Sequence, residues 1–199
     1  MPHASSLEAS PRCWTLASAD VNDDDGIKTS YATVAAPVVV VPADFNGAAY
    51  SGAGGVLDGP GDRFVTITRS NNANQFSVAP IVMVGFNAKG VAVSTSVTPA
   101  NDDGNDVLTF ATPIRTITSI SFPAQGGAGG TFKIGVNDIV ASDGQPFRQV
   151  RGGAAGNVVV GFVEGGSDTL PCAAGEHHDV RVARLYYTNT TAWPVTLYQ

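Results

Sequence analysis

Short apolar runs, separated by glycine, proline, asparagine and aspartate, follow one another along most of the chain. Residues 63–68 and 131–136 alternate with a period of two, which is the spacing of a strand that buries one face. The apolar runs 81–86 and 91–97 flank the four residues 87–90, which end in glycine, and this arrangement predicts a hairpin. The pattern therefore predicts strands joined by tight turns.

These signals predict an all-β protein with three parts. Residues 1–33 have no lasting periodicity and are expected to form an extended N-terminal arm, with a packed irregular N-terminus as the alternative. About seven strands are expected between residues 34 and 140, with turns every eight to twelve residues, so 34–142 is interpreted as an antiparallel β-sandwich or jelly-roll-like domain. Residues 143–199 are expected to form a small C-terminal β-module.

The C-terminal module contains a dense apolar run at 157–163, an alternating basic and apolar segment at 180–187, and a short run at 195–198. In the middle segment, alternation predicts that Leu185 and Tyr187 lie on a core face. The opposite face would then hold Val180, Val182, Arg184 and Tyr186. Because this second face is apolar with one charge, we expect the sandwich or a neighbouring subunit to cover it.

Composition supports strands over helices. The chain has 23 glycines and 12 prolines, and glutamate and lysine occur only three times each. Glycine, proline and β-branched residues are all disfavoured inside helices, whereas strands separated by turns accommodate them.

The charge indicates which partners to expect. A formal net charge of −6 and an isoelectric point near 4.8 make direct nucleic-acid binding unfavourable, because an acidic surface repels phosphate. Only 14% of residues are charged, which favours a homo-oligomer or an assembly in which other subunits cover part of the surface. The longest apolar runs are strand-sized, so no membrane-spanning helix is expected.

The two cysteines, Cys13 and Cys172, are far apart in the sequence and are interpreted as free thiols. The first residues lack the basic and apolar regions of a signal peptide. Both observations predict synthesis in the cytoplasm.

Candidate chemical groups are sparse. The acidic segments 20–26 and 101–106 depart from the calcium-loop pattern at the glycine and final glutamate positions, so they are interpreted as solvated turns. Cys172, His177 and His178 offer at most three zinc ligands, and adjacent histidines on a strand point to opposite faces. We therefore predict no metal site, no cofactor and no catalytic residues, and hence a protein that is not an enzyme.

Aromatic residues gather near the C-terminal end. Tyr186, Trp193 and Tyr198, together with Arg184, are candidates for an interface or a glycan contact, because such rings act as anchors or sugar platforms. The alternative is that alternate members of this group pack into the core.

The same C-terminal stretch resembles a known family: small β-rich virion proteins of tailed bacteriophages and gene transfer agents, of the spike-base or head-decoration type. Their module typically runs Ala-Gly-(Asn/Asp)-Val-x-Val, Ala-Gly, (Val/Pro)-x-Arg-Val-x-Arg-(Val/Ile), Thr-Gly-Thr-Thr-Ala and a final Leu-Tyr. The corresponding segments here are 155–160, 174–175, 180–185, 188–192 and 197–198. The resemblance covers about 45 residues; His177-His178-Asp179 replaces a frequent Leu-Pro, and Asn189 replaces a glycine.

The resemblance implies a non-enzymatic structural component of a phage virion, made in the bacterial host cytoplasm. Its partners would be other virion proteins, such as the major capsid protein or fibre and tail subunits. A carbohydrate- or receptor-binding module of a fibre or spike is the alternative. A β-fold glycan hydrolase is a third hypothesis, which would need two carboxylates facing each other across a groove.

Overall fold

The computed structural model describes residues 13–16, 23–47, 54–57, 62–70, 76–102, 104, 106–127, 129–141, 146–186 and 188–198. Regular structure in these residues is antiparallel β apart from one 3-10 turn, η1 (Pro42–Asp44), so the predicted all-β class is confirmed. No helix in the described part of the chain has the length and apolar character needed to cross a membrane.

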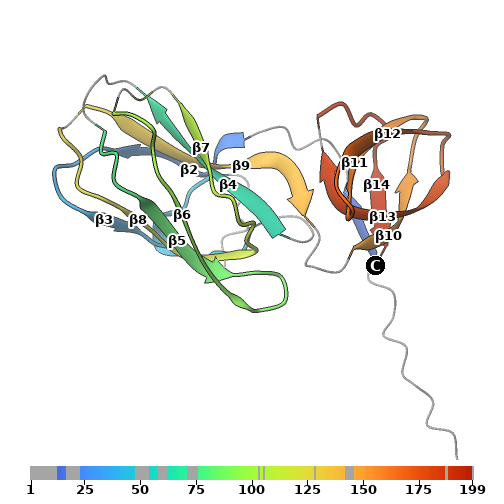
Figure 1. Cartoon of the computed structure of the whole chain (residues 1–199), viewed down its shortest axis with the longest axis horizontal. Coiled ribbons are helices and arrows are strands. Elements are labelled where there is room, and N and C mark those ends of the chain that lie inside the picture. Colours follow the sequence, from blue (N-terminus) through green and yellow to red (C-terminus); the bar gives the residue numbers. More distant parts are fainter. Residues whose placement is uncertain are drawn as a thin grey trace, which may run out of the picture.

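The strands form two lobes, which Figure 1 shows side by side. The larger lobe is a sandwich and the smaller one is a curled sheet near the C-terminus. The strand bounds are β1 Cys13–Leu16, β2 Asp23–Ala32, β3 Val38–Val40, β4 Asp62–Ser70, β5 Ile81–Phe86, β6 Ala92–Val97, β7 Val107–Thr109, β8 Thr116–Phe122, β9 Thr131–Ala141, β10 Phe147–Gly152, β11 Gly156–Phe162, β12 Ser167–Cys172, β13 His177–Tyr186 and β14 Val195–Tyr198.

The larger lobe packs a four-stranded sheet, in the order β3-β8-β5-β6, against β2, β9, β4 and β7. Alternate residues of both layers point inward, for example Met83 of β5 and Ile134 of β9, which are both fully buried. The predicted hairpin is confirmed: β5 and β6 pair from Ile81 opposite Val97 to Phe86 opposite Ala92. Described residues 34–141 contain β3 to β9, in agreement with the expected seven strands.

A buried arginine closes one end of the sandwich. The guanidinium of Arg69 on β4 donates from Nε and Nη2 to the two carboxylate oxygens of Asp106, each at 2.6 Å. It also donates to the carbonyl oxygen of Asn101 at 3.0 Å and lies over the ring of Phe76, 5.1 Å from its centroid. Two-point pairing satisfies a charge that is 1% exposed, so the end of the acidic 101–106 loop anchors β4.

Strand β9 belongs to both lobes. Its register with β4 shifts between the Arg63–Val140 and Val65–Val136 pairs, which places a bulge at residues 137–139. Arg63 donates to the carbonyl oxygen of Asn137 at 3.0 Å inside this bulge. Bulges bend strands, and after this one β9 pairs with β13, so Val140 is buried in the core of the smaller lobe.

The smaller lobe holds its own core, formed by residues of β9, β10, β11, β13 and β14 with Cys172 and Ala192. Strands β10 and β12 were not expected from the sequence. Their stretches, Phe147–Gly152 and Ser167–Cys172, show no clean alternation, and β12 contains a proline. They form because β10 pairs with β13 and β14, and β12 pairs with β11.

The prediction of an extended N-terminal arm is wrong for residues 13–16 and 23–32. These residues form β1, which pairs with β14, and β2, which pairs with β9. Ile27 of β2 is fully buried in the sandwich core. Partners distant in sequence supply both pairings, so local periodicity could not reveal them. Residues 1–12 and 17–22, and the predicted boundary between 142 and 143, lie outside the described residues.

The face assignment of β13 from strict alternation was right for Leu185 and wrong for Val182, and Tyr187 lies outside the described residues. The register between β11 and β13 shifts between Gly161 and Phe162, so Val182 and Leu185 both point into the core of the smaller lobe and are fully buried. A bulge inserts an extra residue and changes which side chains share a face. Val180 packs against the same core, whereas Arg184 is exposed.

Candidate functional site

A surface cleft of about 460 Å³ brings two of the predicted site residues together, Arg184 and Tyr186. One wall is β13, which contributes these two residues and Ala183. The other wall is the end of β11 and the turn into β12, where Gly165 and Gly166 have φ of 97° and 80°. These positive φ values favour glycine, and they turn the chain sharply enough to leave the cleft open.

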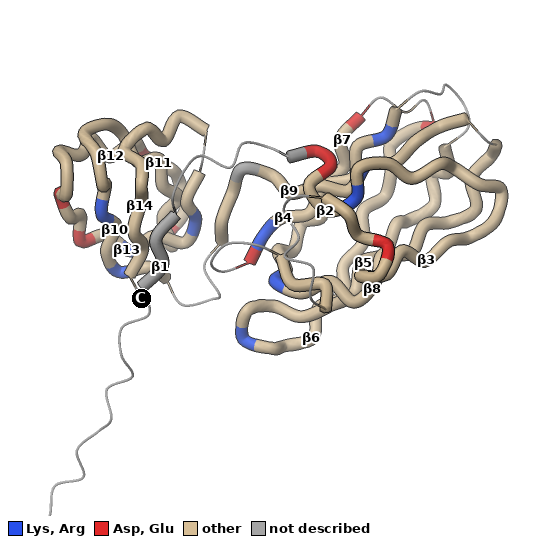
Figure 2. The backbone as a smooth tube through the Cα atoms, turned by 180° about the vertical axis from the view of Figure 1, so that it is seen from behind, with Lys and Arg blue, Asp and Glu red and all other residues tan. Residues whose placement is uncertain are grey.

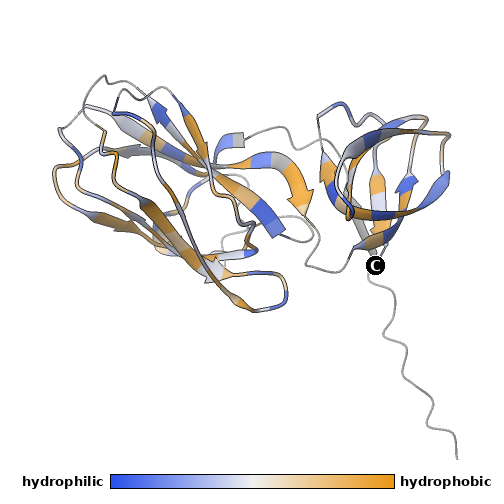
Figure 3. Cartoon of the chain, viewed as in Figure 1, coloured by the Kyte–Doolittle hydropathy of each residue, from blue (hydrophilic) through white to orange (hydrophobic). Residues whose placement is uncertain are grey.

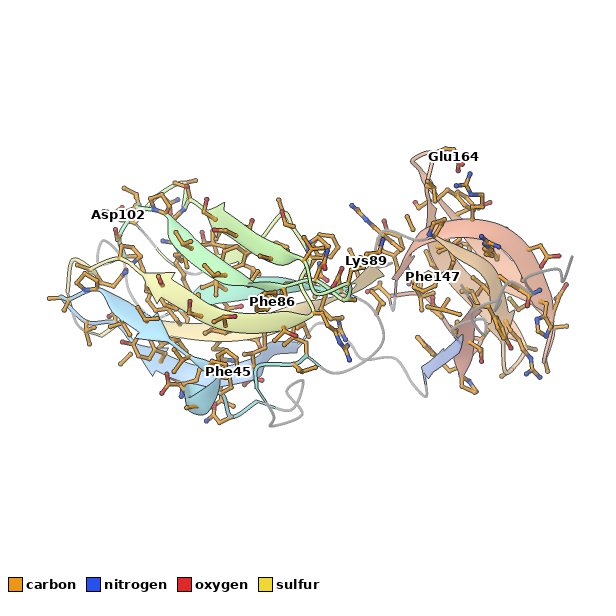
Figure 4. The ribbon with its side chains drawn as sticks, turned by 90° about the horizontal axis from the view of Figure 1, so that it is seen from below. Phe45, Phe86, Lys89, Asp102, Phe147 and Glu164 are labelled. Carbon is orange, nitrogen blue, oxygen red and sulfur yellow. The ribbon has the colours of Figure 1, made fainter. Side chains whose placement is uncertain are left out.

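The β11–β12 turn is fastened to β13 at its tip. The backbone N–H of Val163 donates to the carbonyl oxygen of Arg181 at 3.4 Å. Beside it, Arg181 and Glu164 form an ion pair at 3.4 Å, with both side chains about two-thirds exposed. Figure 4 labels Glu164 at the outer end of the smaller lobe. An ion pair this exposed contributes little stability, so the backbone hydrogen bond is expected to contribute more to holding the turn against β13.

Arg184 links the cleft to the larger lobe. Its guanidinium carbon lies 5.3 Å from the centroid of the Phe64 ring on β4, a cation–π distance. Phe64 is 7% exposed, so the contact covers an apolar ring at the junction of β4, β9 and β13. The sandwich contacts Arg184 in this way, but Arg184 stays exposed, and Val180 and Val182 of the same predicted face pack in the core of the smaller lobe.

Tyr186 is half-buried against β11. A Cβ built on Gly161 would lie 3.3 Å from the Tyr186 ring and hydroxyl and 3.4 Å from Cβ of Arg184. Glycine at this position therefore lets both site residues lie close to the backbone of β11. The cleft thus presents a guanidinium, a phenol and the hydroxyl of Ser167 beside apolar Phe162 and Val163. Such a lining can bind hydroxyl or carboxylate groups through hydrogen bonds and a ring face.

The structure does not place Trp193 or Tyr198 in this cleft. The Trp193 indole N–H donates to the carbonyl oxygen of Thr190 at 2.7 Å, and its ring packs against the core of the smaller lobe. Tyr198 lies on β14 with its ring 5.9 Å from that of His177. Trp193 therefore packs against the core, which was the alternative to an interface or glycan contact.

The histidine and cysteine candidates do not form a metal site in the described structure. His177 Nδ1 lies 2.9 Å from Oε1 of Gln149, whose amide donates to Asp179 at 2.7 Å. Cys172 is a free, buried thiol, and burial raises its pKa. Among the described residues, no group of three or more His, Cys, Asp or Glu side chains is arranged to hold a metal ion. The side chain of Cys13 and segment 20–22 lie outside the described residues.

The motif residues of the C-terminal stretch form a clamp within the smaller lobe. Thr190 Oγ1 accepts from the backbone N–H of Val159 at 2.9 Å and donates to the carbonyl oxygen of Tyr186 at 2.6 Å. Thr191 Oγ1 accepts from the N–H of Asn157 at 2.9 Å. These bonds tie the start of β11 to Tyr186 and to the segment after β13.

Asn189 begins this clamp with φ of 65°. Asparagine and glycine are the residues that adopt this left-handed conformation most readily. The position where the resembled pattern has glycine is therefore one that asparagine can occupy with little backbone strain.

Sequence reasoning found Arg184 and Tyr186 but missed the wall formed by residues 161–167. The only available signal was the Gly165-Gly166 pair, which predicts a turn without indicating what the turn faces. No family model, curated protein or solved structure matches this chain. The functional argument therefore rests on the residues and the geometry described above.

Proposed function

We propose that this protein is a non-enzymatic structural component of a bacteriophage virion, such as a capsid decoration, a spike base or a head or tail accessory protein. The observation that carries the proposal is the ordered series of short motifs from Ala155 to Tyr198. Its threonines and glycines hold the smaller lobe together. Such a structural role is expected if related proteins share this framework and differ in the surfaces that bind their partners.

Two features, one of the larger lobe and one of the whole chain, support a role in assembly. Large apolar side chains are exposed on it, including Val39 at 55% and Phe86 at 43%. Monomeric proteins seldom leave such residues clustered, whereas subunits of an assembly cover them on binding. The low fraction of charged residues points in the same direction.

Fractionation of particles tests this role. Particles of the phage that encodes the chain are purified on a density gradient, washed at high salt, and analysed by quantitative mass spectrometry. We expect the protein to remain with the particles at a fixed copy number. A protein found only in the soluble fraction of the lysate would refute the proposal.

A second function, recognition of a glycan or receptor, is favoured by one observation: Arg184 and Tyr186 line the same cleft. We expect Arg184→Gln to weaken glycan binding at least about tenfold, because a charge-assisted hydrogen bond contributes roughly 1.5–3 kcal/mol. Arg181→Gln is the matched control, since Arg181 lies on the same strand and does not line this cleft. No binding by the wild type across a glycan array would contradict this second function.

A further inference from the structure

The four-stranded sheet of the larger lobe has an uncharged outer face. Strands β3, β5, β6 and β8 contain no charged residue, although the chain has 28 Lys, Arg, Asp and Glu residues in total. A sheet face that meets water usually alternates buried apolar residues with polar and charged ones. Figure 2 shows the charged positions, and Figure 3 shows the apolar character of β3 and β5.

The pairing registers define this outer face. Val39 lies opposite Ser121, which lies opposite Val82, which lies opposite Ser96. The next row joins Val84 to Ser94, and the last joins Phe86 to Ala92. Small hydroxyl groups and apolar side chains thus cover the face from β3 to β6. Such a surface can be covered by another sheet edge or face without leaving a charge unpaired.

Strand β6 is also an unprotected edge. In the part of the chain that the structure describes, it pairs with β5 on one side and with no strand on the other. Edge strands are usually protected from association by charge, by proline or by shortness. β6 has six residues and none of these features. Each of the other outer strands has at least one of these features. Strand β12 contains Asp168 and Pro171, β2 contains Asp24 and Lys28, and Pro37 directly precedes the three-residue β3; β7 and β1 have only three and four residues.

We propose that two copies of this chain pair antiparallel through β6, so that their four-stranded sheets join into one continuous sheet. Charge favours a second copy as the occupant. The protein carries a net charge of −6, and this sheet is where two copies can meet without like charges in contact. Pairing of β6 with β3 of another copy would instead build a ring or an open filament, and Pro37 directly before the three-residue β3 opposes it.

Symmetry restricts the register of this pairing. Two identical antiparallel strands in one sheet are related by a twofold axis normal to the sheet, and residues directly opposite each other point to the same face. When as much of β6 as possible is paired, the axis therefore passes between the two copies of Ser94 or between the two copies of Thr95. In either register, Ser94 and Ser96 of one copy lie opposite or diagonal to the same residues of the other.

Sedimentation velocity of the full chain, over a range of concentrations, tests the pairing. We expect a wild-type dimer and a dissociation constant raised at least about tenfold in the double variant Ser94→Lys/Ser96→Lys, because like charges facing each other across an interface cost several kcal/mol. The matched control is Val107→Lys/Thr109→Lys, which puts two lysines at exposed positions of the β7 edge in the opposite sheet. Circular dichroism confirms that each variant is folded.

A crosslinking measurement makes the test specific to β6. On mild oxidation, Ser94→Cys should give a covalent dimer in the register centred on Ser94, and a mixture of Ser94→Cys and Ser96→Cys should give one in the register centred on Thr95. Thr109→Cys should give no more than the wild-type chain. A monomeric wild type, or equal loss of the dimer in both lysine variants, would overturn the proposal. The pairing rests on the proposed structural role for its biological purpose, but a monomeric protein would refute the pairing alone and leave particle fractionation to decide the role.

Discussion

Replacing Leu185 by alanine perturbs the core of the smaller lobe at its centre. Leu185 is fully buried, opposite Val140 of β9 on one side and Val160 of β11 on the other. Removing three carbons loses about 2.4 kcal/mol of transfer free energy, at roughly 0.8 kcal/mol for each, and the remaining cavity adds to this. We expect the free energy of unfolding to fall by about 3 kcal/mol.

Tryptophan fluorescence during urea unfolding measures this loss where it occurs. Both tryptophans of the chain are in the smaller lobe: Trp14 is on β1, which pairs with β14, and Trp193 packs against the affected core. With a urea dependence of about 2 kcal/mol per molar, the expected loss lowers the unfolding midpoint by about 1.5 M.

Val163→Ala is the control, because Val163 is an apolar residue of the same lobe that is 43% exposed. We expect it to change stability by less than about 0.5 kcal/mol. If Leu185→Ala and Val163→Ala gave equal midpoints, Leu185 would not occupy a packed core, and the position of β13 between β9 and β11 would be refuted.

Three further outcomes follow from other parts of the structure. Asp106→Asn should lower the free energy of unfolding by about 2 kcal/mol in a denaturant titration, because it leaves the buried Arg69 charge without its counter-ion; partial exposure of Asp106 keeps the loss below the 3–5 kcal/mol of a fully buried pair. Gly85→Ala should prevent stable folding, as seen by circular dichroism, since the new Cβ would overlap the carbonyl oxygen of Thr116 on the neighbouring strand. The buried Cys172 thiol, whose pKa is raised, should resist alkylation at pH 8 until denaturant is added, and rapid labelling of its peptide in mass spectrometry would contradict its burial.

The sequence was sufficient for those elements whose partners are close along the chain. The hairpin around residues 87–90 is one example, because the Asn87 side chain accepts from the backbone N–H of Lys89 and of Val91 and so organises the turn locally. The alternation in residues 131–136 correctly indicated Phe132, Ile134 and Val136 as core residues. In both cases, the local pattern and the final packing agree.

Elements that depend on distant partners could not be predicted in this way. β1 and β2 have no periodicity of their own and form by pairing with β14 and β9, about a hundred residues or more away. The bulges in β9 and β13 move side chains between faces, so alternation failed at Val182. Arg184 and Tyr186 could be recognised as candidates from their residue types. The opposite wall of their cleft could not, because it depends on how the β11–β12 turn packs beside β13.

A density map of the intact phage particle tests the proposed structural role most directly. We predict that the two-lobed chain fits density at a symmetric position, where other virion subunits contact the larger lobe or the cleft at Arg184 and Tyr186. A map whose density is fully explained by other proteins, from particles in which this chain is undetectable, would contradict the role.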